Sequence, residues 1–229
     1  KSCIAAICLS ISLLLIVDVL RGSPWIKGSP LGYDVMGGAR YYGIGNEYMG
    51  ILISCSILGI AVILDSARKR FLSYSIIGIW GGVLAIIALP NLGANLGGSI
   101  AACVAFGMAS LCLLNRRISL KAILALGAFV PASVILLFIY DGQRSITSQS
   151  HLGQTYQLFD QEGIAGFLQI LLRKWSMNVK LIRYTIWSRV FLVCLGAISI
   201  LFYRPIGILK SLMEANPIFR WGLVSATAG

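Results

Sequence analysis

Residues 3–20 have the sequence CIAAICLSISLLLIVDVL, in which Asp18 is the only charged side chain. A membrane-spanning helix needs about 20 mainly apolar residues, and this stretch comes close to that length. Similar runs recur along the 229-residue chain. The predicted spans are 3–20, 48–64, 71–90, 99–115, 122–140 and 186–203, and a further apolar run starts at 221 and continues to 229. They predict an all-α fold, a polytopic transmembrane helical bundle that forms a single transmembrane domain over residues 1–229.

The composition excludes most other classes of protein. Hydrophobic residues make up 58% of the chain and charged residues 12%, against about 25% charged residues in a typical soluble domain. With a mean hydropathy of +0.86, the chain has more apolar residues than one soluble core can bury. Disordered proteins, secreted disulfide scaffolds and cytosolic enzymes are thereby excluded.

The net charge of +11 would suggest nucleic-acid binding in a soluble protein. Here the basic residues lie beside the predicted spans, where they set orientation and meet anionic lipid headgroups. We therefore expect no nucleic-acid partner. Basic residues collect in 68–70, 116–121 and 204–220, which predicts that these loops and the N-terminus are cytoplasmic. The outer segments are then 21–47, 91–98 and 141–185, although the last of these is itself basic.

Both ends of the sequence predict a fragment of a longer protein. The chain starts at Lys1 without a methionine, and it ends at Gly229, nine residues into an apolar run that begins at Trp221. A spanning helix needs about 20 residues, so we expect the chain to continue.

Residues 164–185 differ from the spans because their apolar and basic side chains separate by helical spacing. Ile164, Leu168, Leu171 and Trp175 share one face, and the opposite face includes Arg173. This pattern predicts an amphipathic helix lying in the membrane interface. Its basic face either holds a lipid phosphate or rests on anionic headgroups.

The six cysteines all fall in apolar runs, without CxxC spacing or a neighbouring histidine. We expect buried free thiols and no metal site, and the sequence leaves any cofactor open. Asp18 precedes Arg21 by three residues, which predicts a local ion pair at a span end.

Three outer segments concentrate the unusual residues. Residues 37–48 combine glycines, aromatics, an arginine, an amide and a carboxylate. The polar groups of such a non-helical backbone at membrane depth must form hydrogen bonds with protein or water, which predicts a re-entrant or cavity-lining turn. Residues 90–98 place two asparagines among glycines, and residues 141–154 contain the only histidine. A plain interhelical turn and separately satisfied loop residues would explain the same patterns.

Because two predicted spans separate each of these segments from the next, all three fall on the same side of the membrane. Their polar side chains are therefore candidates for a single outward-facing cavity. Arginine and amide donors suit phosphate, and a carboxylate or histidine suits proton transfer. The candidate catalytic residues are Glu47 and His151, of which Glu47 is the preferred general base. The candidate substrate-binding residues are Arg40, Asn46, Asn91, Asn95, Arg144 and Arg173.

The same segments resemble an uncharacterised family of bacterial polytopic membrane proteins. The resemblance rests on Ala39–Asn46, Gly93–Gly98 and Ser150–Gly153 and extends through Arg173, so it covers most of the chain. Members of that family often carry an alkaline-phosphatase-like ectodomain before the membrane part. The resemblance implies a bacterial cytoplasmic (inner) membrane and a substrate handled outside the cytoplasm, and it assigns no catalytic residue.

Three functional hypotheses follow. The first is an enzyme module of the cell envelope that acts on a phosphate-bearing lipid or a polyprenyl-linked glycan at the outer face. The second is a transporter or flippase for the same class of substrate, since transporters also use glycine-broken segments at a membrane entrance. The third is a non-catalytic anchor for an ectodomain or a partner subunit.

Overall fold

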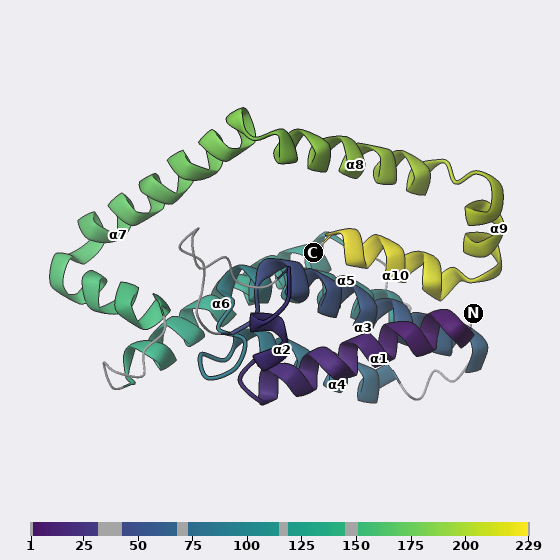
Figure 1. Cartoon of the computed structure of the whole chain (residues 1–229), viewed down its shortest axis with the longest axis horizontal. Coiled ribbons are helices and arrows are strands. Elements are labelled where there is room, and N and C mark those ends of the chain that lie inside the picture. The colour runs from purple at the N-terminus through teal and green to yellow at the C-terminus, as the bar shows by residue number, and fades with distance from the viewer. Residues whose placement is uncertain (1, 32–42, 68–72, 115–118, 145–150, 229) are drawn as a thin grey trace. The chain divides into compact units, whose positions relative to one another are not determined.

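The computed structural model describes residues 2–31, 43–67, 73–114, 119–144 and 151–228, and all the regular structure among them is helical (Figure 1). The predicted all-α class is therefore confirmed for these residues. The helices are α1 (Ser2–Leu20), α2 (Pro24–Lys27), α3 (Asn46–Ala67), α4 (Ser73–Ala88), α5 (Leu96–Leu113), α6 (Leu120–Gly142), α7 (His151–Tyr184), α8 (Ile186–Tyr203), α9 (Gly207–Ala215) and α10 (Pro217–Ala228).

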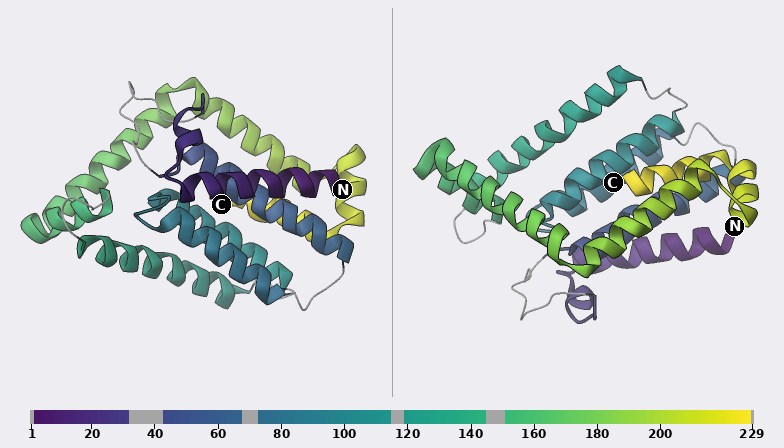
Figure 2. Two further views of the ribbon diagram at one scale, coloured as in Figure 1. Left: turned by 60° about the horizontal axis from the view of Figure 1, so that its bottom comes forward. Right: turned by 90° about the horizontal axis from the view of Figure 1, so that it is seen from above.

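The chain divides into two compact units, each of which is described by itself. Unit 1 comprises Lys1–Leu137 and Glu214–Gly229, and unit 2 comprises Phe138–Met213. In unit 1, α3 packs against α1, α5 and α10, while α4 packs mainly against α5 (Figure 2). Helix α3 is thus the central helix of unit 1.

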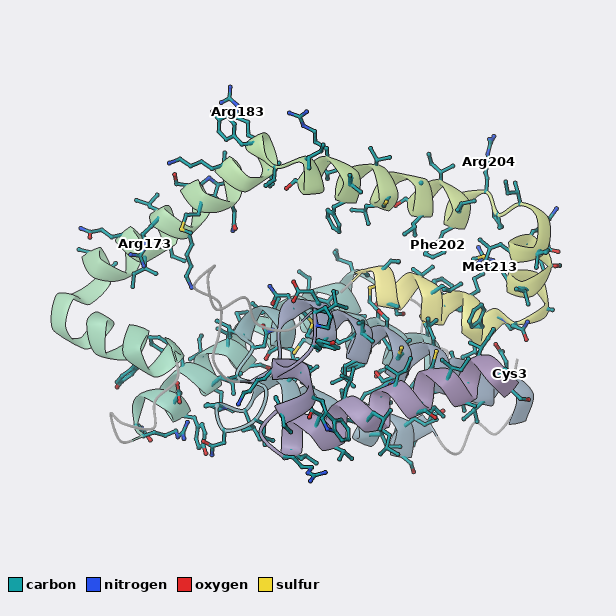
Figure 3. All side chains as sticks on the ribbon, viewed as in Figure 1. Cys3, Arg173, Arg183, Phe202, Arg204 and Met213 are labelled. Atoms are coloured by element: carbon teal, nitrogen blue, oxygen red, sulfur yellow. The ribbon has the colours of Figure 1, made fainter. Side chains whose placement is uncertain are left out.

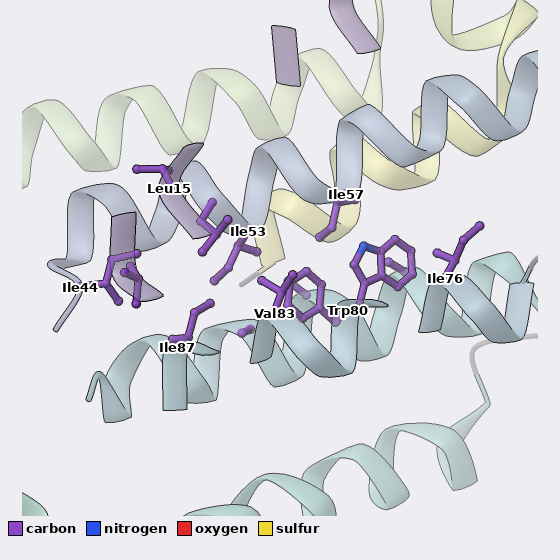
Figure 4. Close-up of a cluster of buried hydrophobic side chains, with 14 of the residues drawn as sticks. Leu15, Ile44, Ile53, Ile57, Ile76, Trp80, Val83 and Ile87 are labelled. Atoms are coloured by element: carbon purple, nitrogen blue, oxygen red, sulfur yellow. The ribbon is translucent and has the colours of Figure 1, made fainter. Parts of the chain in front are cut away.

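The core of unit 1 is built from the facing sides of α3, α4 and α5 (Figure 4). Ile57 of α3 is 1% exposed and Trp80 of α4 is 3% exposed. The ring of Trp80 stacks on Phe106 of α5 with 5.8 Å between the ring centroids. Small buried residues on α5, among them Ala102 and Ala105, let the helices approach closely.

Among the described residues, four helices are long and apolar enough to cross a membrane, namely α1, Asn46–Asp65 of α3, α5 and α6. Large apolar side chains also point outward from them: Leu13 is 62% exposed, Leu124 63% and Leu136 72%. Contiguous apolar surface of this kind is rare in soluble monomers. Several long apolar helices with apolar outer faces indicate a membrane protein.

Other predicted spans have different lengths in the structure. Helix α4 is a shorter apolar helix of 16 residues that ends at Ala88, whereas the sequence predicts a span over 71–90, of which residues 71 and 72 lie outside the described residues. The last apolar run belongs to α10, which begins at Pro217 rather than at 221. The short helix α9 occupies part of the segment 204–220, which the sequence predicts only as a loop.

Unit 2 contains α7 and α8 and a sharp bend between them. Gly163 interrupts α7 with a positive φ of 65°, a conformation that glycine adopts without steric cost. The following segment, Gly163–Tyr184, meets Ser188–Phe202 at 80°. Arg173 and Arg183 lie on that segment, and the side chain of Arg183 extends away from the helix (Figure 3).

Two local predictions need correction. The carboxylate of Asp18 does not form the predicted ion pair with Arg21: Asp18 is 1% exposed, and its carboxylate accepts hydrogen bonds from the backbone N–H groups of Trp25 (2.9 Å) and Ile26 (3.0 Å). It therefore caps α2. All six cysteines are free thiols, but only Cys103 is buried: Cys8, Cys55 and Cys112 are partly exposed, and Cys3 and Cys194 are exposed, because the apolar helices that carry them present apolar faces outward.

Candidate functional site

Two of the three unusual segments lie against each other at one end of unit 1. Residues 43–46 lead into α3, and residues 93–98 lead into α5; together we call them the junction. The backbone N–H of Ile44 donates to the carbonyl oxygen of Gly93 at 2.9 Å. Ile44 itself is fully buried, so the contact is part of the core of unit 1.

Asn95 is the centre of the junction. Its side-chain nitrogen Nδ2 donates to the carbonyl oxygen of Ile44 at 3.0 Å and to Oδ1 of Asn46 at 3.1 Å. Its Oδ1 accepts from the N–H of Gly98 at 2.8 Å, which caps the N-terminus of α5. With both amide hydrogens donated and 1% of the residue exposed, Asn95 holds the two segments together and positions Asn46.

Two glycines make the close approach of the backbones possible. Gly43 has a positive φ of 79°, and a Cβ atom there would collide with the carbonyl group of Gly93. A Cβ atom at Gly93 would lie 2.5 Å from the carbonyl oxygen of Ile87. Glycine is therefore required at both positions by packing, whatever else the junction does.

Asn46 and Glu47 lie at the surface of the junction, where α3 begins. Both residues are exposed, and Glu47 is in the first turn of α3. The N-terminus of α5 lies beside that of α3, because the cap residue Asn95 bonds to Asn46. Helix N-termini attract anions and stabilise an ionised carboxylate. This end of unit 1 can therefore attract an anionic group and present a carboxylate able to accept a proton.

The hydroxyl of Tyr48 connects the junction end to the α1–α2 region. It donates to Oγ of Ser29 at 2.7 Å, and that hydroxyl in turn donates to the carbonyl oxygen of Ile26 at 3.0 Å. Asp18 holds the same short helix from the other side. Backbone and side-chain hydrogen bonds thus anchor the segment around α2 beside the start of α3.

The other sequence-predicted residues fall elsewhere. Asn91 is exposed in the turn between α4 and α5, and Arg40 lies outside the described residues. Arg144, His151 and Arg173 belong to unit 2. His151 is the first residue of α7, and Arg173 is exposed on the same helix.

Arg144 is part of a local ion pair in unit 2. Its Nη1 lies 3.0 Å from Oδ1 of Asp141, whose side chain is fully buried. The same end of α6 packs against Tyr156 of α7, whose ring meets Phe138 edge-on with 5.3 Å between the centroids. The pairing neutralises the carboxylate and leaves Arg144 partly exposed.

The sequence did not indicate the role of Asp65. Near the end of α3, its carboxylate oxygens accept from the backbone N–H groups of Ile218 (3.2 Å) and Phe219 (2.7 Å) and so cap α10. A lone aspartate near the end of an apolar run was the available signal, but its partners lie more than 150 residues away in the sequence. Within the described part of the chain, no three His, Cys, Asp or Glu side chains gather as metal ligands would.

Comparison with known proteins identifies no relative: no family model, no curated protein and no solved structure matches the chain.

Proposed function

We propose that the chain is a multi-pass protein of the bacterial cytoplasmic membrane, and that the junction is part of an extracytoplasmic site for a phosphate-bearing lipid or a polyprenyl-linked envelope glycan. In this proposal Glu47 is the general base and takes the proton of an attacking hydroxyl, while the bond from the attacked atom of the substrate to its leaving oxygen breaks and that oxygen departs with the electron pair. Asn46 donates a hydrogen bond to the substrate, and Arg40 supplies positive charge from the segment before the junction.

The observation that carries the proposal is the meeting of two helix N-termini beside an exposed carboxylate. Asn95 joins the cap of α5 to the first residue of α3 by a hydrogen bond of 3.1 Å. Partial positive charge from both helices favours a phosphate group there. Because Asn95 is rigidly held, Asn46 and Glu47 start from a fixed backbone, which general base catalysis requires.

The basic face of α7 supports a membrane-bound substrate. Arg173 is exposed, as are Lys174, Lys180 and Arg183, and each would cost about 2.5 to 3.5 kcal/mol at the centre of a bilayer. Since Gly163–Tyr184 and Ser188–Phe202 meet at 80°, the two segments cannot both follow the membrane normal. We propose that α8 crosses the membrane and that this part of α7 lies in the interface, where Arg173 meets lipid phosphates.

The proposal is tested with the isosteric variant Glu47→Gln in proteoliposomes that contain a polyprenyl-pyrophosphate-linked glycan. We expect turnover of the glycan, followed by thin-layer chromatography, to fall by about 10²-fold or more, because a general base contributes that much. The matched control is Glu214→Gln, the same change at an exposed residue of α9, which should leave turnover unchanged. Wild-type turnover in Glu47→Gln would refute the assignment, and a wild-type protein without turnover would refute the enzyme hypothesis.

A further inference from the structure

Two cysteines meet between α1 and α3, away from the junction. Cys8 lies in α1 and Cys55 in α3, and these two helices pack against each other. A side-chain hydrogen bond joins the two thiols. Both are free and partly exposed. Helix packing therefore brings two reactive side chains that lie far apart in the sequence into direct contact.

A glycine explains why the two helices come close at this point. Gly59 follows Cys55 by about one turn on the same face of α3. A Cβ atom at Gly59 would lie 3.2 Å from the Cβ atom of Cys8 and 2.9 Å from the side chain of Leu9. Small residues let helix backbones approach closely in this way. The backbone of α1 at Cys8 is thus held against the face of α3 that carries Cys55.

This arrangement is the one that a disulfide requires. Two cysteines can be bridged only when their backbones are close and their side chains point toward each other. The tight packing of Cys8 at Gly59 meets the first condition, and the hydrogen bond between the thiols of Cys8 and Cys55 meets the second. A change of side-chain rotamer is then enough to bring the sulfur atoms together.

We propose that Cys8 and Cys55 form a modification site, at which oxidation by hydrogen peroxide joins α1 to α3 through a disulfide. Both thiols lie within helices that are long and apolar enough to cross a membrane. An oxidant must therefore be small and uncharged to reach them, as hydrogen peroxide is. The site is separate from the junction and does not depend on the function proposed there.

The reaction has two steps. One thiol attacks an oxygen of the peroxide: the O–O bond breaks, an S–OH bond forms, and the thiol proton leaves with the other oxygen as water. The second thiol then attacks that sulfur, so that the S–S bond forms, the S–OH bond breaks and a second water departs. The two thiols lose two electrons, which the peroxide gains. Because the thiols are already in contact, the second step needs no encounter.

The disulfide fastens α1 to the central helix of unit 1. About two turns of α3 separate Cys55 from Tyr48, whose hydroxyl holds Ser29 next to α2. The covalent bond therefore adds to the hydrogen bonds that already anchor the α1–α2 region to α3. A disulfide also restricts the unfolded chain, and we expect oxidation to stabilise unit 1.

Peptide mapping tests the bond directly. The full chain in nanodiscs, with a single molecule in each, is reduced and then treated with hydrogen peroxide. We expect a linked pair of peptides that contains Cys8 and Cys55, and the thiols that react after denaturation should fall from six to four. A reductant added after denaturation should restore all six. If Cys8 and Cys55 stay reduced, or become sulfonic acids without joining, the proposal is overturned.

Cys55→Ser tests the pairing, and Cys8→Ser replaces it if that variant does not fold. In either variant we expect the linked pair of peptides to disappear. Cys3→Ser is the matched control, because Cys3 is an exposed thiol on the same helix as Cys8; the yield of the link should not change. If the remaining cysteine of the pair joins another cysteine as readily as it joins its partner in the wild type, the proposal is overturned.

Thermal unfolding distinguishes a disulfide that fits the two helices from one that distorts them. We expect the unfolding midpoint of the oxidised protein to lie about 5 °C or more above that of the reduced protein. Cys55→Ser, treated with peroxide in the same way, should show no such rise. A midpoint that stays the same or falls when the disulfide forms in the wild type would overturn the proposal.

Discussion

At the junction end of unit 1, the buried amide of Asn95 makes three hydrogen bonds within the chain. At the opposite end, which we call the cavity end because the helices leave a cavity there, the buried indole N–H of Trp80 has no partner among the described residues. The junction is closed by backbone contact between Gly43 and Gly93. The cavity end instead leaves about 480 Å³ between its helices. The two ends of unit 1 therefore differ in packing: the helices meet closely at the junction and leave a cavity at the opposite end.

The largest effect should come from breaking the backbone contact of the junction. Gly43→Ala places a Cβ atom against the Gly93 carbonyl and forces alanine into a positive φ, so we expect a loss of about 2 to 5 kcal/mol. Thermal unfolding of the protein in nanodiscs, followed by circular dichroism, measures it. Gly50→Ala is the control: no atom lies within 4 Å of its added Cβ, and alanine favours a helix by about 1 kcal/mol. Equal stability of the two variants would contradict the tight junction.

Removal of the central amide should be the next largest change. Asn95→Ala deletes three hydrogen bonds and leaves the Ile44 carbonyl and the Gly98 N–H buried without their partner. We expect the free energy of unfolding to fall by about 2 to 4 kcal/mol. Hydrogen exchange should show faster exchange at the N–H of Gly98. Unchanged protection there would show that the cap is not needed.

The two aspartates that cap helices allow a direct comparison of the junction end and the cavity end of unit 1. Asp18 is 1% exposed and Asp65 is only partly buried, yet each accepts two backbone N–H groups. We expect Asp18→Ala to cost about 2 kcal/mol and Asp65→Ala about 1 kcal/mol, because water replaces the cap more readily at Asp65. Unfolding midpoints of both variants, measured side by side, test the order; a greater loss at Asp65 would reverse it.

The smallest effect on stability is expected at Trp80. Because its N–H has no partner among the described residues, Trp80→Phe removes an unpaired donor and keeps an aromatic ring, so the unfolding free energy should change by less than about 1 kcal/mol. Thermal unfolding of the variant in nanodiscs measures this change. A loss of several kcal/mol would mean that Trp80 contributes to packing far more than its donor suggests.

The sequence predicts the helices because their cause is local. Apolar residues over 3–20, 99–115 and 122–140 predict helices by length alone, and α1, α5 and α6 occupy those ranges with ends that differ by at most three residues. Helix α4 ends at Ala88, two residues before the end of its apolar run, because the chain then folds back: the backbone N–H groups of Gly93 and Asn95 donate to the carbonyl oxygens of Ile86 and Ile87 in the last turn of that helix. The hydropathy of the sequence does not reveal such a turn.

From the sequence, the candidate residues could be chosen only by their side-chain type and by their position near the ends of predicted spans. Asn46 and Asn95 were both singled out from glycine-rich segments, and the structure brings these two together. That Asn95 is fully occupied by its neighbours, while Glu47 is exposed beside it, depends on the register of α3 against α5. The relation of these residues to Arg144, His151 and Arg173 remains a prediction, since those three belong to unit 2.

What the sequence determined by itself is the helical, strongly apolar character of the chain and the concentration of polar residues between its helices. Those properties follow from composition and spacing over about 20 residues at a time. Only the tertiary structure decided that Asp65 caps α10 and that Asn95 bonds to Ile44. The reason is physical: these contacts join residues from 51 to 154 positions apart, and such pairs form only when the packing of whole helices brings them within hydrogen-bonding distance.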